Sequence, residues 1–281
     1  MRPVAARGRR VWALAGLAVA ASLAVPGGWL ITSAGVDRGA GPQDTVTRAV
    51  TVPQPVTTLD VQSYGAPVQV TAGPVHRVQV TEAITYDPQD GRPPAVPRSV
   101  SNGILTLIEP ACVCSVGFIV TVPPGVGVAA DTGGGPLTVS GAAAANLNSG
   151  GGPVSATGIS GPLVVTTAGG ALTLNGLTGP LQAGTGGGPL LARGMNSATA
   201  TITTGGGDAR IGFTKAPDGL FVSTDGGAAT LTLPSGPYAL TARSFGGPEA
   251  VGIATDPAAG RSITVTTGGG PLRIESAKDQ H

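Results

Sequence analysis

The sequence predicts an all-β protein whose main body is a parallel β-solenoid of about eight short coils. Three observations predict it. A Gly-Gly signal recurs eight times in the C-terminal half, at steps of 17 to 23 residues. A short run of alternating apolar residues follows most copies. Beyond the N-terminus, no segment of ten or more residues shows a helical period with caps. A period near 20 residues is typical of stacked repeats, in which one supersecondary unit is copied along an axis.

The copies share two or three Gly residues, usually after Thr or Ser and often before Pro-Leu. They read TGGGPL at 132–137, SGGGPV at 149–154, AGGAL at 168–172, TGGGPL at 185–190, TGGGDA at 204–209, DGGAA at 225–229, FGGPE at 245–249 and TGGGPL at 267–272. A second turn, Gly-x-x-Gly-Pro-Leu at 158–163 and 176–181, lies midway between copies, so each coil should hold two turns and two strands. Pro suits the first residue of a strand because it donates no ladder hydrogen bond. Gly is expected to supply corners with positive φ.

Stacked coils should pair at about 4.8 Å and together bury a core that no single coil completes. The residues predicted to face inward are Leu137, Val139, Val154, Leu163, Val165, Leu172, Leu174, Leu181, Leu190, Ile202, Ile211, Leu231, Leu233, Ile263, Val265 and Ile274. A Gly-rich antiparallel β-sandwich is the alternative fold. A collagen-like helix is excluded because Gly does not occupy every third position.

Residues 45–125 are predicted to form a β-rich capping region, and residues 126–275 the solenoid. Expected strands in the capping region are 46–52, 56–61, 68–70, 76–82, 104–108 and 118–122, with an exposed loop at 87–97. A short tail, 276–281, follows the last repeat and leaves little to cover it. We therefore expect the final coil to be protected only by the charges of Arg273, Glu275, Lys278 and Asp279.

The N-terminal residues 1–10 form a basic arm, and an uncharged apolar run follows within 11–33. As a helix, about 21 residues span roughly 31 Å, close to the thickness of a bilayer core. The sequence therefore predicts a transmembrane signal anchor with a cytoplasmic arm and a linker at 34–44. A cleaved signal peptide is the alternative. Either way the bulk of the chain is expected outside the cytoplasm, attached to the cell membrane or, after cleavage, secreted.

Composition argues against several kinds of chemistry. The net charge is +1, and no charged residue lies between Thr132 and Ala192, so a basic surface for nucleic acid is absent from the sequence. The two histidines, His76 and His281, do not build a catalytic triad or a zinc site. The Gly tracts lack the Lys of a phosphate loop, and only Asp208 matches the repeated Asp of a calcium-binding roll. We expect no catalytic residue, no metal and no cofactor.

Two small groups of residues are candidate sites. Cys112 and Cys114 are expected to form a disulfide in an oxidising compartment, with free or intermolecular thiols as the alternative. In an extended strand their Cα atoms would be about 6.5–7 Å apart, so the disulfide requires a kinked backbone. Asp208, Arg210 and Asp225 lie nearly one coil apart and form a candidate contact patch; a solvated surface cluster is the alternative. The longer, charged loops between Arg193 and Arg261 are where a ligand would be expected.

Three parts of the chain resemble the bacterial putative-adhesin family of unknown function: FIVTVPPG at 118–125, TGGGPLTVSG at 132–141, and the repeats as far as Ile274. The resemblance covers residues 45 to 274 and implies a cell-envelope protein with no established chemistry. A non-enzymatic adhesin or scaffold with an unknown protein or glycan partner is therefore expected. The alternatives are an accessory regulator or sensor of an envelope-stress response, acting through a membrane partner, and a polysaccharide-active β-helix enzyme.

Overall fold

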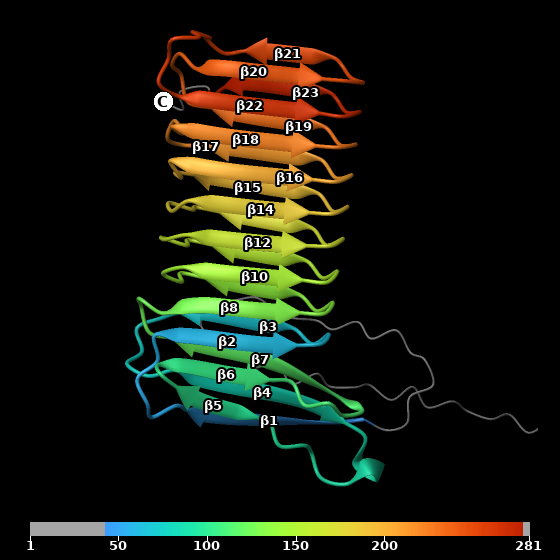
Figure 1. Ribbon diagram of the computed structural model, residues 1–281. Helices are drawn as coiled ribbons and strands as arrows, with labels where there is room; N and C mark the ends of the chain where they lie inside the picture. Colours follow the sequence, from blue (N-terminus) through green and yellow to red (C-terminus); the bar gives the residue numbers. More distant parts are fainter. Residues whose placement is uncertain (1–42, 278–281) are drawn as a thin grey trace, which may run out of the picture. The chain divides into compact units, whose positions relative to one another are not determined.

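In the computed structural model, residues 43–277 are described, and they fold into two long β-sheets that face each other (Figure 1). The only helical turn in this range is a 3-10 turn at Pro88–Asp90. No helix between residues 43 and 277 has the length and apolar character needed to cross a bilayer. The predicted basic arm 1–10, the predicted membrane segment 11–33 and His281 lie outside the described residues.

One sheet has twelve strands and the other eleven. In spatial order, the twelve-stranded sheet contains β1 (Asp44–Thr51), β4 (Gln79–Tyr86), β7 (Cys114–Val122), β3 (Val68–Ala72), β9 (Leu137–Ser140), β11 (Val154–Thr157), β13 (Leu172–Asn175), β15 (Leu190–Met195), β17 (Ala209–Phe213), β19 (Ala229–Leu233), β23 (Leu272–Ser276) and β21 (Glu249–Gly252). The eleven-stranded sheet contains β20 (Ala239–Ser244), β22 (Ser262–Thr267), β18 (Gly219–Thr224), β16 (Thr199–Thr204), β14 (Leu181–Thr185), β12 (Leu163–Thr167), β10 (Ala145–Ser149), β8 (Gly127–Thr132), β2 (Thr58–Ser63), β6 (Ile104–Ile108) and β5 (Arg98–Ser101).

Each coil consists of one strand of the eleven-stranded sheet and the strand of the other sheet that follows it. The coils stack in parallel, as where Leu147 of β10 pairs with Val165 of β12. This parallel pairing confirms the predicted solenoid-like, all-β arrangement and excludes the antiparallel sandwich. Eight coils follow Val126, and two more, β2–β3 and β6–β7, come from the segment that we expected only to cap the stack.

The core lies between the two sheets and is built by period-2 alternation along each strand. In β12, for example, Leu163 and Val165 are buried whereas Val164 and Thr166 are exposed. Every residue that the sequence predicted to face inward is buried, from Leu137 to Ile274. Branched aliphatic side chains at these positions suit a pleated surface that is covered on one face and solvated on the other.

The order of the coils in space differs from their order in the chain at both ends. The C-terminal coil, β22–β23, lies between β18–β19 and β20–β21, because β22 pairs with both β18 and β20. The first coil, β2–β3, likewise lies between β6–β7 and β8–β9. The expectation that the last coil in sequence is the exposed one, shielded by its own charges, is therefore wrong. The terminal coil in space is β20–β21 (Figure 1).

The exposed end of the stack carries a charged residue at an inward position. Glu249 of β21 pairs with Leu272 of β23, whose side chain is buried, so Glu249 occupies the column that holds Leu172 and Leu190 in earlier coils. Its carboxylate accepts the backbone N–H of Ser244. Glu249 is itself exposed, as is every residue of β21. A charge at this position of an edge strand opposes the addition of a further strand.

The opposite end is closed by antiparallel strands. β5 pairs with β6, and β4 pairs with both β7 and β1. Inside this end lies Glu82, which is buried and forms an ion pair of 3.2 Å with Arg98. Burial raises the pKa of Glu82, and the charges of Arg98 and Arg48 lower it in part. The strand that we expected from His76 begins instead at Gln79, and His76 lies exposed on the preceding bend.

The Gly corners are explained by close approach of neighbouring coils rather than by positive φ. None of the Gly residues in the eight Gly-Gly copies has a positive φ; those that do include Gly141, Gly158 and Gly176, in the turns between coils. A Cβ on Gly152 would lie 2.2 Å from the carbonyl oxygen of Gly135, whereas one on Gly151 would meet nothing within 4 Å. The expected positive-φ corner is thus wrong for the Gly-Gly copies.

Candidate functional site

A column of hydroxyls, all buried except the half-buried last one, marks the corner at which every coil but β6–β7 passes from the eleven-stranded to the twelve-stranded sheet. Strand register aligns these residues, and several donate to the carbonyl three residues later, as Ser149 Oγ does to Gly152 at 3.0 Å. In spatial order the column is Ser63, Thr132, Ser149, Thr167, Thr185, Thr204, Thr224, Thr267 and Ser244. Each corner is therefore built alike, and departures from the pattern are informative.

Tyr64 is such a departure. It follows Ser63 at the place where Gly133 follows Thr132 in the next coil, and its side chain is 67% exposed. Its backbone N–H donates to Glu109 Oε2 at 2.6 Å. The same oxygen accepts the Ser63 hydroxyl at 2.8 Å, and Glu109 Oε1 accepts the N–H of Val116 at 3.1 Å. The corner thus presents an aromatic ring on a backbone that a buried carboxylate holds in place.

Beside Tyr64 the outer surface of β2, β8 and β10 forms a hollow with a volume of about 550 Å³. We call it the polar hollow; it is lined by Asp60, Gln62, Ser63, Tyr64, Ala129, Ala130, Asp131, Gly133, Asn146 and Asn148. Strand register explains the depression. Ala129 pairs with Asp60 on one side and Asn146 on the other, so a short side chain lies between two longer ones.

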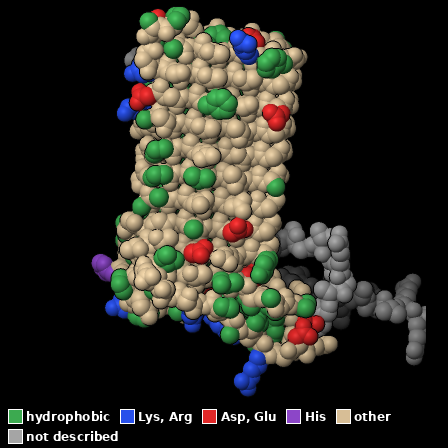
Figure 2. All heavy atoms as spheres, in the orientation of Figure 1, with side chains coloured by type: hydrophobic (Ala, Val, Ile, Leu, Met, Phe, Trp, Pro, Cys, Tyr) green, Lys and Arg blue, Asp and Glu red, His purple; other side chains and the backbone are tan. Residues whose placement is uncertain are grey.

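The polar side chains of the hollow are partly oriented by one another. Asn148 Nδ2 donates to Asp131 Oδ2 at 3.0 Å, and Thr166 Oγ1 donates to Asn148 Oδ1 at 3.0 Å. Gln62 Nε2 lies 3.4 Å from Asp60 Oδ2. Among residues 43–277, neither Asp60 nor Asp131 has an ion-pair partner. Figure 2, which views the outer face of the eleven-stranded sheet, shows that charged groups on it are few.

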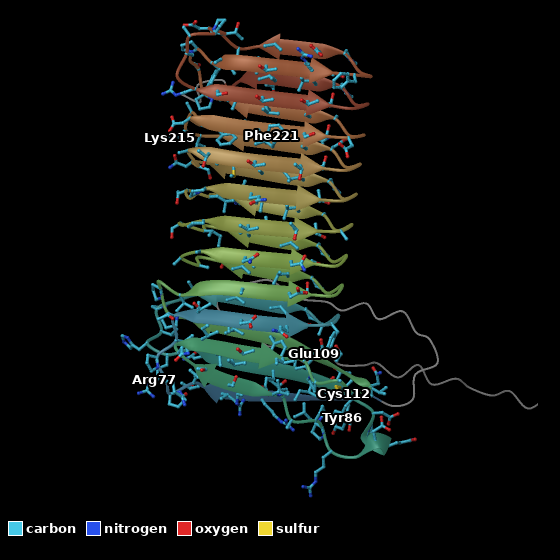
Figure 3. All side chains as sticks on the ribbon, viewed as in Figure 1. Arg77, Tyr86, Glu109, Cys112, Lys215 and Phe221 are labelled. Carbon is cyan, nitrogen blue, oxygen red and sulfur yellow. A yellow bond between two sulfur atoms is a disulfide. The ribbon has the colours of Figure 1, made fainter. Side chains whose placement is uncertain are left out.

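A second hollow of about 530 Å³ lies on the other side of Tyr64. We call it the disulfide hollow; it is lined by Tyr64, Glu109, Pro110, Ala111, Cys112, Val113 and Cys114. Cys112 and Cys114 are joined as a disulfide, with Cα atoms 5.2 Å apart, on a bend that leads into β7. Figure 3 shows Glu109 and Cys112 close together at the same end of the lower coils. Val113, at the tip of this bend, is 88% exposed.

The three residues of the predicted contact patch are only partly brought together. Arg210 Nη2 lies 3.7 Å from Asp208 Oδ2; the Arg210 side chain is exposed and Asp208 is half-buried. Asp208 Oδ1 accepts the N–H of Ala228 in the next coil at 3.0 Å, which gives this residue a role in coil stacking. Asp225 lies on the corner after β18 and, within residues 43–277, forms no ion pair with either. The patch remains a prediction with no cavity of its own among those described.

Sequence reasoning missed Tyr64, Glu109 and the polar hollow. One signal was present: SYGAPV at 63–68 is a degenerate copy of the TGGGPL corner, with Tyr in place of the first Gly. Recognising it would have marked Tyr64 as the substitution that breaks the pattern. Asp60 and Asp131 offered no such signal, because only the pairing of β2 with β8 makes them neighbours.

No family model matches the chain, and no curated protein matches it. Solved structures do. A protein from Bacteroides fragilis described as a putative adhesin has 13% identity and a TM-score of 0.46, over 83% of this chain and 97% of that one. A putative adhesin from Parabacteroides distasonis has 12% identity and a TM-score of 0.45, over the same shares. A protein from that species described as a putative lipid binding protein has 10% identity and a TM-score of 0.42, over 84% of this chain and 97% of that one. Proteins described as putative adhesins are therefore among the solved structures that are similar to this chain, and the likeness concerns strand arrangement alone.

Proposed function

We propose that the protein is a non-enzymatic cell-envelope protein, an adhesin or scaffold that presents its β-coils outside the cytoplasm for contact with a partner. The observation that carries the proposal is the outer face of the eleven-stranded sheet. It is a long, regular surface of mostly short polar side chains, interrupted beside Tyr64 by the polar hollow. A rigid stack with a local, chemically distinct depression is suited to binding, because the scaffold fixes the contact residues before the partner arrives.

The proposal includes attachment to the membrane through residues 11–33 and an outward position for the coils. The arginines of residues 1–10 support this orientation, because positive residues beside an apolar segment favour the cytoplasmic side. The pairing of Cys112 with Cys114 agrees with it, since structural disulfides persist in oxidising compartments.

The test uses the full chain with a C-terminal epitope tag, expressed in a bacterial host. The tag should fractionate with membranes and should bind antibody on intact spheroplasts, while a cytoplasmic marker protein stays inaccessible. Release of the tagged chain into the medium would support a cleaved signal peptide instead of an anchor. A tag found in the cytosol, or reached only after lysis, would contradict the proposal.

The adhesive role has a separate readout. Host cells that display the chain should adhere to a surface coated with bacterial cell-wall glycan more strongly than cells that carry the empty vector. Equal adhesion of the displaying cells and the empty-vector cells would contradict the adhesive role but would be compatible with a scaffold role.

A further inference from the structure

The polar hollow combines an aromatic ring with carboxylates and amides on one fixed surface. Tyr64 stands at its edge, and its backbone is held on both sides. The N–H is bound by buried Glu109, and the carbonyl oxygen packs so closely against Gly133 that a Cβ there would have no room. An aromatic ring on such a backbone loses little conformational freedom when a ligand stacks on it.

The electrostatics of the hollow favour a cation. Asp60 and Asp131 both line it, none of its lining residues is Lys or Arg, and the following stretch from Thr132 to Ala192 carries no charge. Two carboxylates held on adjacent strands without a counter-charge repel each other, and a positively charged ligand group relieves that repulsion. The hydrogen bond from Asn148 uses one oxygen of Asp131 and leaves the other free to accept.

The remaining side chains favour a ligand with many hydroxyls. Asn146 is exposed and carries an amide with two donors and an acceptor. Gln62 is also exposed; its Nε2 lies 3.4 Å from Asp60 Oδ2, which leaves its second N–H and its amide oxygen. Planar amides and carboxylates beside an aromatic face provide hydrogen bonds for hydroxyl groups and a stacking surface for the apolar side of a ring.

We propose that the polar hollow binds a glycan that contains amino sugars with free, protonated amines. One sugar ring stacks on Tyr64, its ammonium group lies between Asp60 and Asp131, and its hydroxyls bond with the amides. The disulfide hollow continues the surface past Tyr64, so a longer oligosaccharide contacts both hollows and binds more tightly than a single sugar. The inference deepens the proposed contact role by naming the ligand class and its site.

The test measures binding to the full chain in detergent by calorimetry, in mildly acidic buffer that keeps sugar amines protonated. The probe is a β-1,4-linked glucosamine hexamer, and its matched neutral probe is the N-acetylglucosamine hexamer. The glucosamine hexamer should bind at least about tenfold more tightly, a difference of about 1.4 kcal/mol. Added salt should weaken its binding, as expected for an exposed ionic contact.

Variants locate the site. Tyr64→Ala, and the pair Asp60→Asn with Asp131→Asn, should each reduce affinity for the glucosamine hexamer at least about tenfold. Phe221→Ala removes an aromatic ring that is exposed on the same sheet but in a distant coil (Figure 3 labels Phe221), and Asp44→Asn removes an exposed carboxylate on β1 of the other sheet. Both control variants should bind like the unchanged protein, and circular dichroism verifies the folding of every variant.

Three outcomes would overturn the inference: equal affinity for the two hexamers, unchanged affinity in the Tyr64 and aspartate variants, or a lysine oligomer that binds as tightly and with the same dependence on these residues. None of them bears on whether the coils lie outside the membrane, which the spheroplast experiment decides separately.

Discussion

The carboxylate of Glu109 holds the backbone of Tyr64, with the Tyr64 N–H donating to Oε2 at 2.6 Å. By strand register Glu109 occupies, in the coil β6–β7, the place that Ser63 and Thr132 take in the hydroxyl column. The Glu109 side chain is longer than that of Ser or Thr, so its carboxylate reaches the Tyr64 N–H and the Ser63 hydroxyl of the neighbouring coil. The corner of one coil is thus organised by a residue of its neighbour.

Glu109→Gln should destabilise these coils. The carboxylate accepts three hydrogen bonds through two oxygens, and an amide would turn a donor toward at least one N–H or O–H donor. We expect a loss of about 2 kcal/mol, in the range measured for hydrogen bonds to charged groups. Chemical unfolding and hydrogen exchange at the Tyr64 amide would measure it. Glu275→Gln, at a half-buried surface carboxylate whose ion pair with Arg273 is open to solvent, is the matched control and should change stability little.

Gly151→Ala and Gly152→Ala should have opposite signs. A Cβ at position 152 would lie 2.2 Å from the carbonyl oxygen of Gly135, so the two coils must separate, at a cost of about 2–3 kcal/mol. A Cβ at position 151 has open space and no positive φ, and Ala there reduces the freedom of the unfolded chain by about 0.4–1 kcal/mol. Thermal unfolding would show a lower midpoint for the Gly152 variant and an unchanged or higher one for the Gly151 variant. A similar loss in both would refute the explanation by close approach.

Glu249→Leu should promote association of the protein through the end of the stack. The substitution restores the apolar residue found at this position in neighbouring coils and leaves the edges of β20 and β21 without an inward charge. Sedimentation should show larger species at increasing protein concentration. Glu275→Leu adds the same side chain at an outward position and should stay like the unchanged protein; association in that variant too would point to general surface hydrophobicity.

Glu82→Gln should raise stability at neutral pH and not at acid pH. Because burial raises the folded pKa of Glu82 above its ordinary value of 4.5, the folded state holds this proton more tightly than the unfolded state. The stabilisation that comes from this bound proton is fully present below pH 4.5, the ordinary pKa, and is lost as the pH rises through the pKa of Glu82 in the folded state. Gln imitates the protonated form, and Arg98 remains solvated because its side chain is 43% exposed. The melting temperature of the variant should therefore match that of the unchanged protein under acid conditions, below the ordinary pKa, and exceed it at neutral pH. A lower melting temperature at neutral pH would show that the ion pair with Arg98 outweighs burial.

The repeat period was enough to predict the interior but not the ends of the stack. Positions such as Leu172 and Val165 are set by local alternation, which is visible in the sequence. The insertion of β22–β23 between earlier coils depends on which edge a late strand joins, and no local pattern encodes it. The sequence predicted positive φ at the Gly-Gly corners, and this was wrong. The sequence shows only that these positions lack a side chain; the close approach of the neighbouring coil, which is the reason, is visible only in the structure.

The candidate site was less predictable than the fold. Asp60 and Asp131 are far apart in the chain, and strand register alone places them on adjacent strands. In the predicted contact patch, Asp208 and Arg210 form an ion pair at the start of β17, because they are only two residues apart in the chain. Such proximity in sequence does not predict a cavity.

The placement of the last coil also constrains the order in which the molecule is completed. During synthesis, β20 and β21 leave the ribosome before β22 and β23, yet within residues 43–277 each of them has its only ladder partner in those later strands. β20 and β21 therefore gain their native ladder partners only after β22 and β23 have been made. A chain cut short after Arg261 would lose the structure of both. The order of this end of the stack therefore depends on residues 262–276 and not on β20 and β21 themselves.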